Sequence, residues 1–90
     1  MSVSTKVRML MTMKRKNAVQ MAAHMGIHQQ SYRNKLTRES FSSHDLIEIA
    51  ELLGAKLLFE VDGQRILFGR EDLDGERLAH VLEYEKTEAP

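Results

Sequence analysis

The sequence predicts a mainly α-helical fold of four to five helices that ends in a β-hairpin and a last helix. Apolar side chains recur with helical spacing as far as about residue 55. A period of two then appears in residues 55–61 (AKLLFEV) and 64–68 (QRILF). The pair Asp62-Gly63 between these runs is typical of a two-residue type I′ turn.

The N-terminal helix is expected to begin at Ser4 or Thr5. Its inward side chains would be Val7, Leu10 and Met11, with Met9 or Met13 filling gaps in the core. At 90 residues, with 42% hydrophobic and 29% charged residues, the chain is long enough for one small globular domain. The absence of cysteine excludes disulfides and thiolate metal sites.

Two short helices joined by a tight turn are expected next. Asn17 and Gln20 form a capping-box pattern that opens a helix over residues 18–25. Gly26 ends this helix as a left-handed cap, and a second helix should run from about His28 to Thr37. This arrangement is typical of a helix-turn-helix motif.

Ser42 and Asp45 form a second capping-box pattern, which opens an amphipathic helix that ends at Gly54. Four side chains of this helix are expected to close the core, namely Leu46, Ile49, Ala50 and Leu53.

The hairpin register should place Glu60 opposite Arg65 and Leu58 opposite Leu67 on one face, with Phe59 opposite Ile66 on the other. A two-stranded ribbon is marginal alone, so we expect one face to pack on the helices. The cover of the other face would be a last helix, from about Asp74 to Glu85 with Leu78, Val81 and Leu82 inward, or a second subunit. We expect a homodimer, with a self-contained monomer as the alternative. The expected dimerisation residues are Leu58, Leu67, Phe68, Leu78 and Leu82.

The formal net charge of zero conceals a strong asymmetry along the chain. Residues 1–40 carry eight Lys/Arg and one acidic residue, a net charge of +7, whereas residues 41–90 carry five basic and twelve acidic residues, a net charge of −7. Such asymmetry indicates a surface that faces a polyanion. The alternative is charge pairing within the chain or between copies of it.

Amide side chains gather at the start of the second short helix, which reads His28-Gln29-Gln30 and continues to Asn34. A carboxamide offers a donor beside an acceptor and so matches N7 and N6 of adenine in the major groove. The alternative is a solvated polar surface. The expected base-contacting residues are Gln29, Gln30, Arg33 and Asn34. The expected phosphate-contacting residues bracket them and are Lys14, Arg15, Lys16, His28, Lys35, Arg38 and Ser40.

Residues 20–32 (QMAAHMGIHQQSY) resemble the helix-turn-helix of the phage Cro and repressor (XRE-like) family, and the resemblance covers about residues 5–55. Ala22 and Gly26 match the small-residue positions at which the two helices cross. The resemblance implies a dimeric, sequence-specific regulator of transcription, of phage or mobile-element type and acting as a repressor, on a near-palindromic operator in double-stranded DNA. His28 replaces the usual serine or threonine cap, and Ala18 stands where the family commonly has a phosphate-binding glutamine.

These observations divide the chain into a DNA-binding helix-turn-helix domain over residues 1–55 and a dimerisation extension over residues 56–90. We expect no enzyme activity, no cofactor and no metal, because Gly26 separates His24 from His28 and no phosphate-binding loop occurs. A cytoplasmic location without a membrane segment is also expected. Two other functions remain open: a protein-interaction module, such as an antitoxin or inhibitor, that binds a protein partner, and binding of structured RNA.

Overall fold

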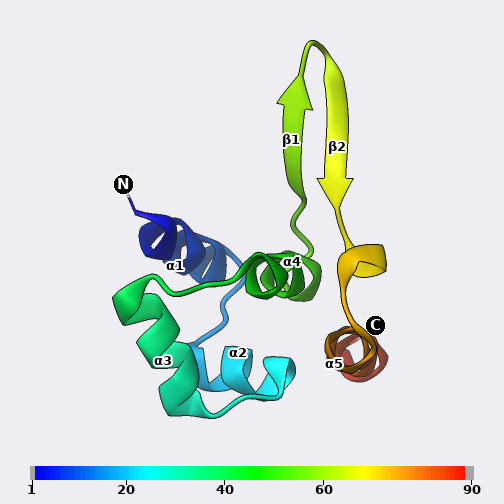
Figure 1. Cartoon of the computed structure of the whole chain (residues 1–90). Coiled ribbons are helices and arrows are strands. Elements are labelled where there is room, and N and C mark those ends of the chain that lie inside the picture. The colour runs from blue at the N-terminus through cyan, green and yellow to red at the C-terminus, as the bar shows by residue number, and fades with distance from the viewer. Residues whose placement is uncertain (1, 89–90) are drawn as a thin grey trace.

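The computed structural model describes residues 2–88 and is mainly helical with a small antiparallel hairpin (Figure 1), as the sequence predicts. No helix in this part of the chain is long and apolar enough to cross a membrane. The elements are α1 (Val3–Met13), α2 (Ala18–Met25), α3 (Gln29–Arg38), α4 (Ser43–Leu52), β1 (Leu57–Val61), β2 (Gln64–Phe68), the 3₁₀ turn η1 (Arg70–Asp72) and α5 (Gly75–Glu88).

Helix α1 begins at Val3, earlier than expected, because the Ser2 hydroxyl caps it by accepting a hydrogen bond from the Thr5 N–H. Its buried face carries Ser4, whose hydroxyl donates to the Leu36 carbonyl at 2.5 Å, together with Val7 and Met11. Because Ser4, Val7 and Met11 form the buried face, Met9 and Met13 point outward and are 50% and 74% exposed. The prediction that Met9 or Met13 fills the core is wrong.

Helices α2 and α3 follow with only a short turn between them. The Asn17–Gln20 capping box is present with both of its hydrogen bonds, at 2.8 and 2.9 Å. Gly26 ends α2 with a φ of 69°, the left-handed conformation expected there. Helix α3 buries Tyr32 and Leu36, and burial raises the pKa of Tyr32 to about 12 despite the opposing charge of Arg8.

Helix α4 carries the second predicted capping box, since Ser42 and Asp45 exchange both hydrogen bonds. Ile49, Ala50 and Leu53 are buried and Leu46 is half-buried against the core, as expected. The helix is buried on more sides than predicted, because α5 covers a further face that carries Asp45 and Glu48. The main core cluster is Val7, Met11, Met21, Ala22, Met25, Tyr32, Leu36, Ile49, Leu52 and Leu53.

The predicted hairpin register is confirmed, with Phe59 opposite Ile66 and Glu60 opposite Arg65. Both turn residues, Asp62 and Gly63, have positive φ, as a type I′ turn requires. The hairpin projects away from the helices (Figure 1). The prediction that one of its faces packs on the helices is therefore wrong, and only its base lies against α4.

Helix α5 packs against α2 and α4 and continues past the expected Glu85. Val81 is fully buried and Leu78 is half-buried, as predicted. Leu82 is 48% exposed, so its predicted inward orientation is wrong.

Candidate nucleic-acid interface

Helix α3 presents the predicted base-contacting residues together on its solvent side. Gln29, Gln30, Arg33 and Asn34 are all exposed, while Tyr32 anchors the opposite side of the helix. The Gln30 Nε2 donates to the Asn34 Oδ1 at 3.1 Å, across one helical turn. This bond holds two amides in a fixed relation and leaves their other donors and acceptors open to solvent.

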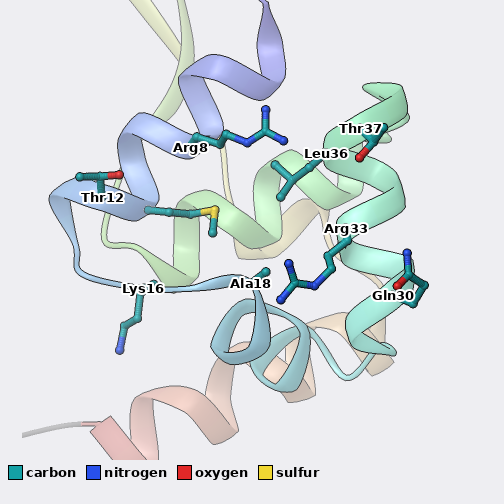
Figure 2. A pocket seen from close by; sticks show the side chains of 9 residues that line it. Arg8, Thr12, Lys16, Ala18, Gln30, Arg33, Leu36 and Thr37 are labelled. Atoms are coloured by element: carbon teal, nitrogen blue, oxygen red, sulfur yellow. The ribbon is translucent and has the colours of Figure 1, made fainter.

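A groove of about 550 Å³ lies beside these amides, between α1, the start of α2 and α3. Figure 2 shows Arg8 reaching toward it from α1 and Arg33 reaching toward it from α3, with Gln30 at its border. The lining residues are Arg8, Met11, Thr12, Lys16, Ala18, Gln30, Arg33, Leu36 and Thr37.

The arginines on this side of the molecule are not neutralised by the fold. Within residues 2–88, no carboxylate lies within ion-pair distance of Arg8, Arg15, Arg33 or Arg38. Much of the basic excess of residues 1–40 is therefore not paired with carboxylates in the folded chain. This favours a surface that faces a polyanion over charge pairing within the chain.

The other predicted phosphate contacts are dispersed around this surface. Lys16 lies at the edge of the groove, with its ammonium 5.4 Å from the centroid of the Tyr84 ring on α5. Lys14 extends toward Gly54, at the end of α4. The remaining members of the set are exposed, namely Arg15 in the turn after α1, His28 at the start of α3, and Arg38 and Ser40 near its end.

Lys35 does not join the other cations. Its ammonium forms an ion pair with Asp45 at 2.8 Å and is only 26% exposed. It lines a different cleft, between α3, α4 and α5, where Glu48 and His80 also lie. Its ion pair with Asp45 weakens the case for Lys35 as a phosphate contact, which stays a prediction.

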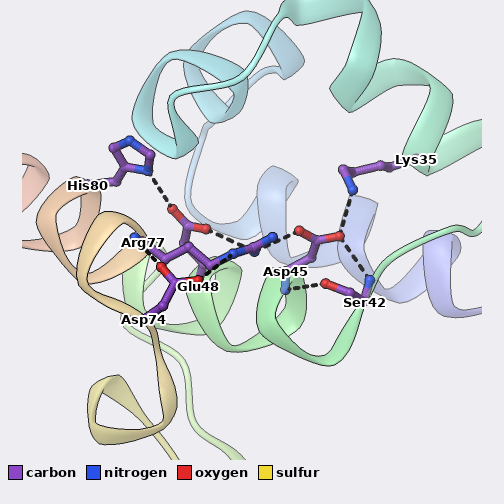
Figure 3. Close-up of polar contacts among 7 residues, drawn as sticks. All are labelled: Lys35, Ser42, Asp45, Glu48, Asp74, Arg77 and His80. Atoms are coloured by element: carbon purple, nitrogen blue, oxygen red, sulfur yellow. Dashed lines mark hydrogen bonds and ion pairs between the residues drawn. The ribbon is translucent and has the colours of Figure 1, made fainter.

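This cleft contains an ion network that sequence reasoning missed (Figure 3). Arg77 of α5 lies 2.9 Å from Asp45 and 3.4 Å from Glu48, and the His80 Nδ1 lies 3.3 Å from Glu48. Burial raises the pKa of Asp45, but hydrogen bonds from Lys35, the Ser42 N–H and Arg77 outweigh it and hold this pKa below its ordinary value. Burial raises the pKa of Glu48 above its ordinary value, against the opposing effects of His80 and Arg77.

The predicted dimerisation residues do not form one surface. Leu58 and Leu67 share a hairpin face with the Glu60–Arg65 ion pair, whereas Phe68 lies on the opposite face. Leu78 and Leu82 belong to α5. The more apolar hairpin face carries Leu57, Phe59, Val61, Ile66 and Phe68.

Three members of that apolar face, Phe59, Val61 and Ile66, are 65%, 55% and 59% exposed and were missed as interface candidates. Their alternation along the two strands was the available signal. Arg8 was also missing from the predicted phosphate-contacting residues. The sequence does indicate that Arg8 and Thr12, four residues apart, share one face of the first helix.

No group of three or more potential metal ligands occurs among residues 2–88. Comparison with known proteins gives no match to a family model, to a curated protein or to a solved structure. The function of the chain has to be inferred from its own side chains.

Proposed function

We propose that the protein is a sequence-specific regulator of transcription that binds double-stranded DNA through a helix-turn-helix formed by α2 and α3. The observation that carries the proposal is the placement of three exposed amides on α3 beside a groove that holds two unpaired arginines. Amides can discriminate bases, and unpaired cations can bind the phosphate backbone.

In this binding mode the N-terminal end of α3 enters the major groove. Gln29 and Gln30 then address neighbouring base pairs, each by a donor and an acceptor to one adenine. Asn34 orients Gln30 through their hydrogen bond and extends the same face by one turn. The acidic half of the chain, in which α5 lies, faces away from the DNA.

The proposal includes binding of DNA by a dimer, because a near-palindromic operator presents two half-sites roughly 34 Å apart. The apolar hairpin face is the surface that a second copy would cover, since Phe59, Val61 and Ile66 are each more than half exposed. A repressor role follows from the resemblance to the phage Cro and repressor family.

The same hairpin face supports the second candidate, a protein-interaction module such as an antitoxin or inhibitor. An apolar ribbon that stays uncovered in a monomer would be available to a different protein. The oligomeric state of the purified chain separates the two candidates. Sedimentation equilibrium of wild type and Phe59→Ser should give a dimer and a monomer, respectively, if a second copy covers the hairpin.

The decisive experiment is selection of bound duplexes from a random DNA library at near-physiological salt. We expect a two-fold-related motif with adenines in each half-site. Gln29→Ala and Gln30→Ala should each weaken binding to the selected duplex by about 1–3 kcal/mol and relax base choice. Glu83→Gln, at an exposed residue of α5 in the acidic half of the chain, is the control and should leave binding unchanged.

Two outcomes would contradict the proposal. Recovery of no motif by a folded protein would favour the protein-interaction module. Preference for A-form RNA duplexes, with no effect of the two glutamine substitutions, would indicate structured-RNA binding instead.

A further inference from the structure

The groove between α1 and α3 is lined by two arginines, one from each of these helices. Arg8 and Arg33 both line it, and neither has a carboxylate partner within residues 2–88. We propose that this groove binds one phosphate of the DNA backbone, held between the guanidinium groups of Arg8 and Arg33. The inference rests on the proposed DNA-binding function and assigns a site within it.

The chemistry of the lining fits a phosphodiester. A guanidinium presents paired N–H donors in a planar fork that matches two phosphate oxygens. The hydroxyls of Thr12 and Thr37 add neutral donors on the same walls. Met11 and Leu36 form apolar parts of the lining. Walls of low polarity strengthen an electrostatic attraction beside them.

The position of the groove gives the phosphate a role in placing α3. Arg8 belongs to α1 and Arg33 to α3, so one phosphate between them would join both helices to the same point of the backbone. Gln30 borders the groove, so its amide lies next to this anchored point. Arg33 then positions α3 on the DNA and does not read a base, which differs from its assignment by sequence.

The first test measures binding of Arg8→Gln and Arg33→Gln to the library-selected duplex and to a scrambled duplex at several salt concentrations. Each substitution should weaken binding to both duplexes by the same factor, about tenfold, because a charge-assisted hydrogen bond to phosphate is lost. The dependence of log K on log salt should become shallower by about 1.8, because the dimer loses one phosphate contact in each half-site.

Lys6→Gln is the matched control, because Lys6 is an exposed cation on α1 that lies about 200° around the helix from Arg8. It should change neither the affinity nor the salt dependence. Arg8→Lys keeps the charge and should retain the wild-type salt dependence, so it separates loss of charge from damage to the fold. Thermal unfolding followed by circular dichroism checks that each variant is folded.

The second test asks whether the two arginines hold the same phosphate. Neutral methylphosphonates are placed at one pair of two-fold-related positions at a time, one in each half-site of the selected duplex, and each variant is measured on every modified duplex. At one such pair, and at the same pair for both arginines, the tenfold effect of the substitution should disappear, because the phosphate that the arginine would contact no longer carries a charge.

Different failures have different meanings. If Arg33→Gln removes the preference for the selected over the scrambled duplex, Arg33 reads a base, and the phosphate site is wrong while the DNA-binding function holds. If Arg8→Gln behaves like Lys6→Gln, or the two arginines couple to different phosphates, the site is also wrong. If the wild type binds neither duplex, both the site and the proposed function are wrong.

Discussion

The arginines in the N-terminal part of the chain differ from those in the C-terminal part in their ion pairing. In the part of the chain that the structure describes, the four arginines before α4 have no ion-pair partner, whereas Arg65, Arg70 and Arg77 each pair with at least one carboxylate. A paired guanidinium serves the fold, and an unpaired one remains available to an external anion. A net charge of zero can therefore describe a molecule in which one half carries unpaired arginines and the other half pairs its arginines with part of its excess of carboxylates.

Asp45 on α4 contacts side chains from both parts of the chain, before and after α4. Its carboxylate forms ion pairs with Lys35 of α3 and Arg77 of α5, so one buried side chain connects α3 to the C-terminal helix (Figure 3). Substitutions at and around this junction test how much of the protein's stability depends on its buried ion pairs.

The largest effect is expected for Asp45→Asn. The substitution removes the charge that faces Lys35 and Arg77 in a site where the Asp45 side chain is only 2% exposed. We expect the free energy of unfolding to fall by about 3 kcal/mol, measured by urea denaturation at neutral pH. Glu76→Gln, at an exposed carboxylate in the first turn of α5, is the control. A loss below about 1 kcal/mol would mean that the junction is dispensable.

Gly26→Ala comes next, because His80 of α5 covers the turn between α2 and α3. An added Cβ would lie 2.4 Å from the His80 Nε2, so the ring would have to leave its position against Glu48. Gly63→Ala meets nothing within 4 Å and has the same left-handed strain. We expect about 1 kcal/mol of destabilisation at Gly63 and about twice that at Gly26. In a His80→Ala background the two losses should become equal, and a persistent difference would exclude the ring as its cause.

The pH dependence of stability should also report on this junction. Because the pKa of Asp45 is lowered by folding, its contribution is present above the ordinary value of 3.8 and is lost as pH falls through the folded pKa. Asp45→Asn should therefore lose less stability than wild type between neutral pH and pH 3. The raised pKa of Glu48 acts in the opposite sense, with a contribution that is present below 4.5 and lost as pH rises through its folded pKa. Equal acid slopes for wild type and Asp45→Asn would contradict the assignment.

The smallest effect is expected at Glu60 on the hairpin. Its ion pair with Arg65 spans 3.2 Å, but both side chains are more than half exposed to solvent. Glu60→Gln should lower the free energy of unfolding by no more than about 0.5 kcal/mol in the same urea experiment. A loss as large as that of Asp45→Asn would mean that exposure does not separate weak from strong pairs in this protein.

Local signals in the sequence predicted the local structure well. The capping boxes at Asn17 and Ser42 involve residues three apart, and the hairpin register follows from the turn pair Asp62-Gly63. The orientation of Met9 was not predictable in this way, because the packing of α1 against α3 decides which side of the helix is buried.

The residues of the candidate site likewise fall into a group that local sequence patterns predict and a group that only tertiary packing brings together. The amides of α3 are consecutive or one turn apart, so the sequence revealed them as a group. Arg8 and Arg33 meet only because α1 and α3 lie on either side of the groove, and Arg77 meets Asp45 across 32 positions of the chain. No spacing rule links such residues, since tertiary packing alone brings them together.

The uneven attachment of α3 has a consequence for its dynamics. Its last turns are fastened by Lys35 and Ser4, whereas His28 provides no side-chain acceptor for the first N–H groups, unlike Asn17 and Ser42 at the starts of α2 and α4. The amide proton of Ser31 should therefore exchange with solvent faster than its counterparts at Gln20 and Asp45, which donate to the capping side chains. The end of α3 that carries the two glutamines is thus expected to be the less protected end of this helix.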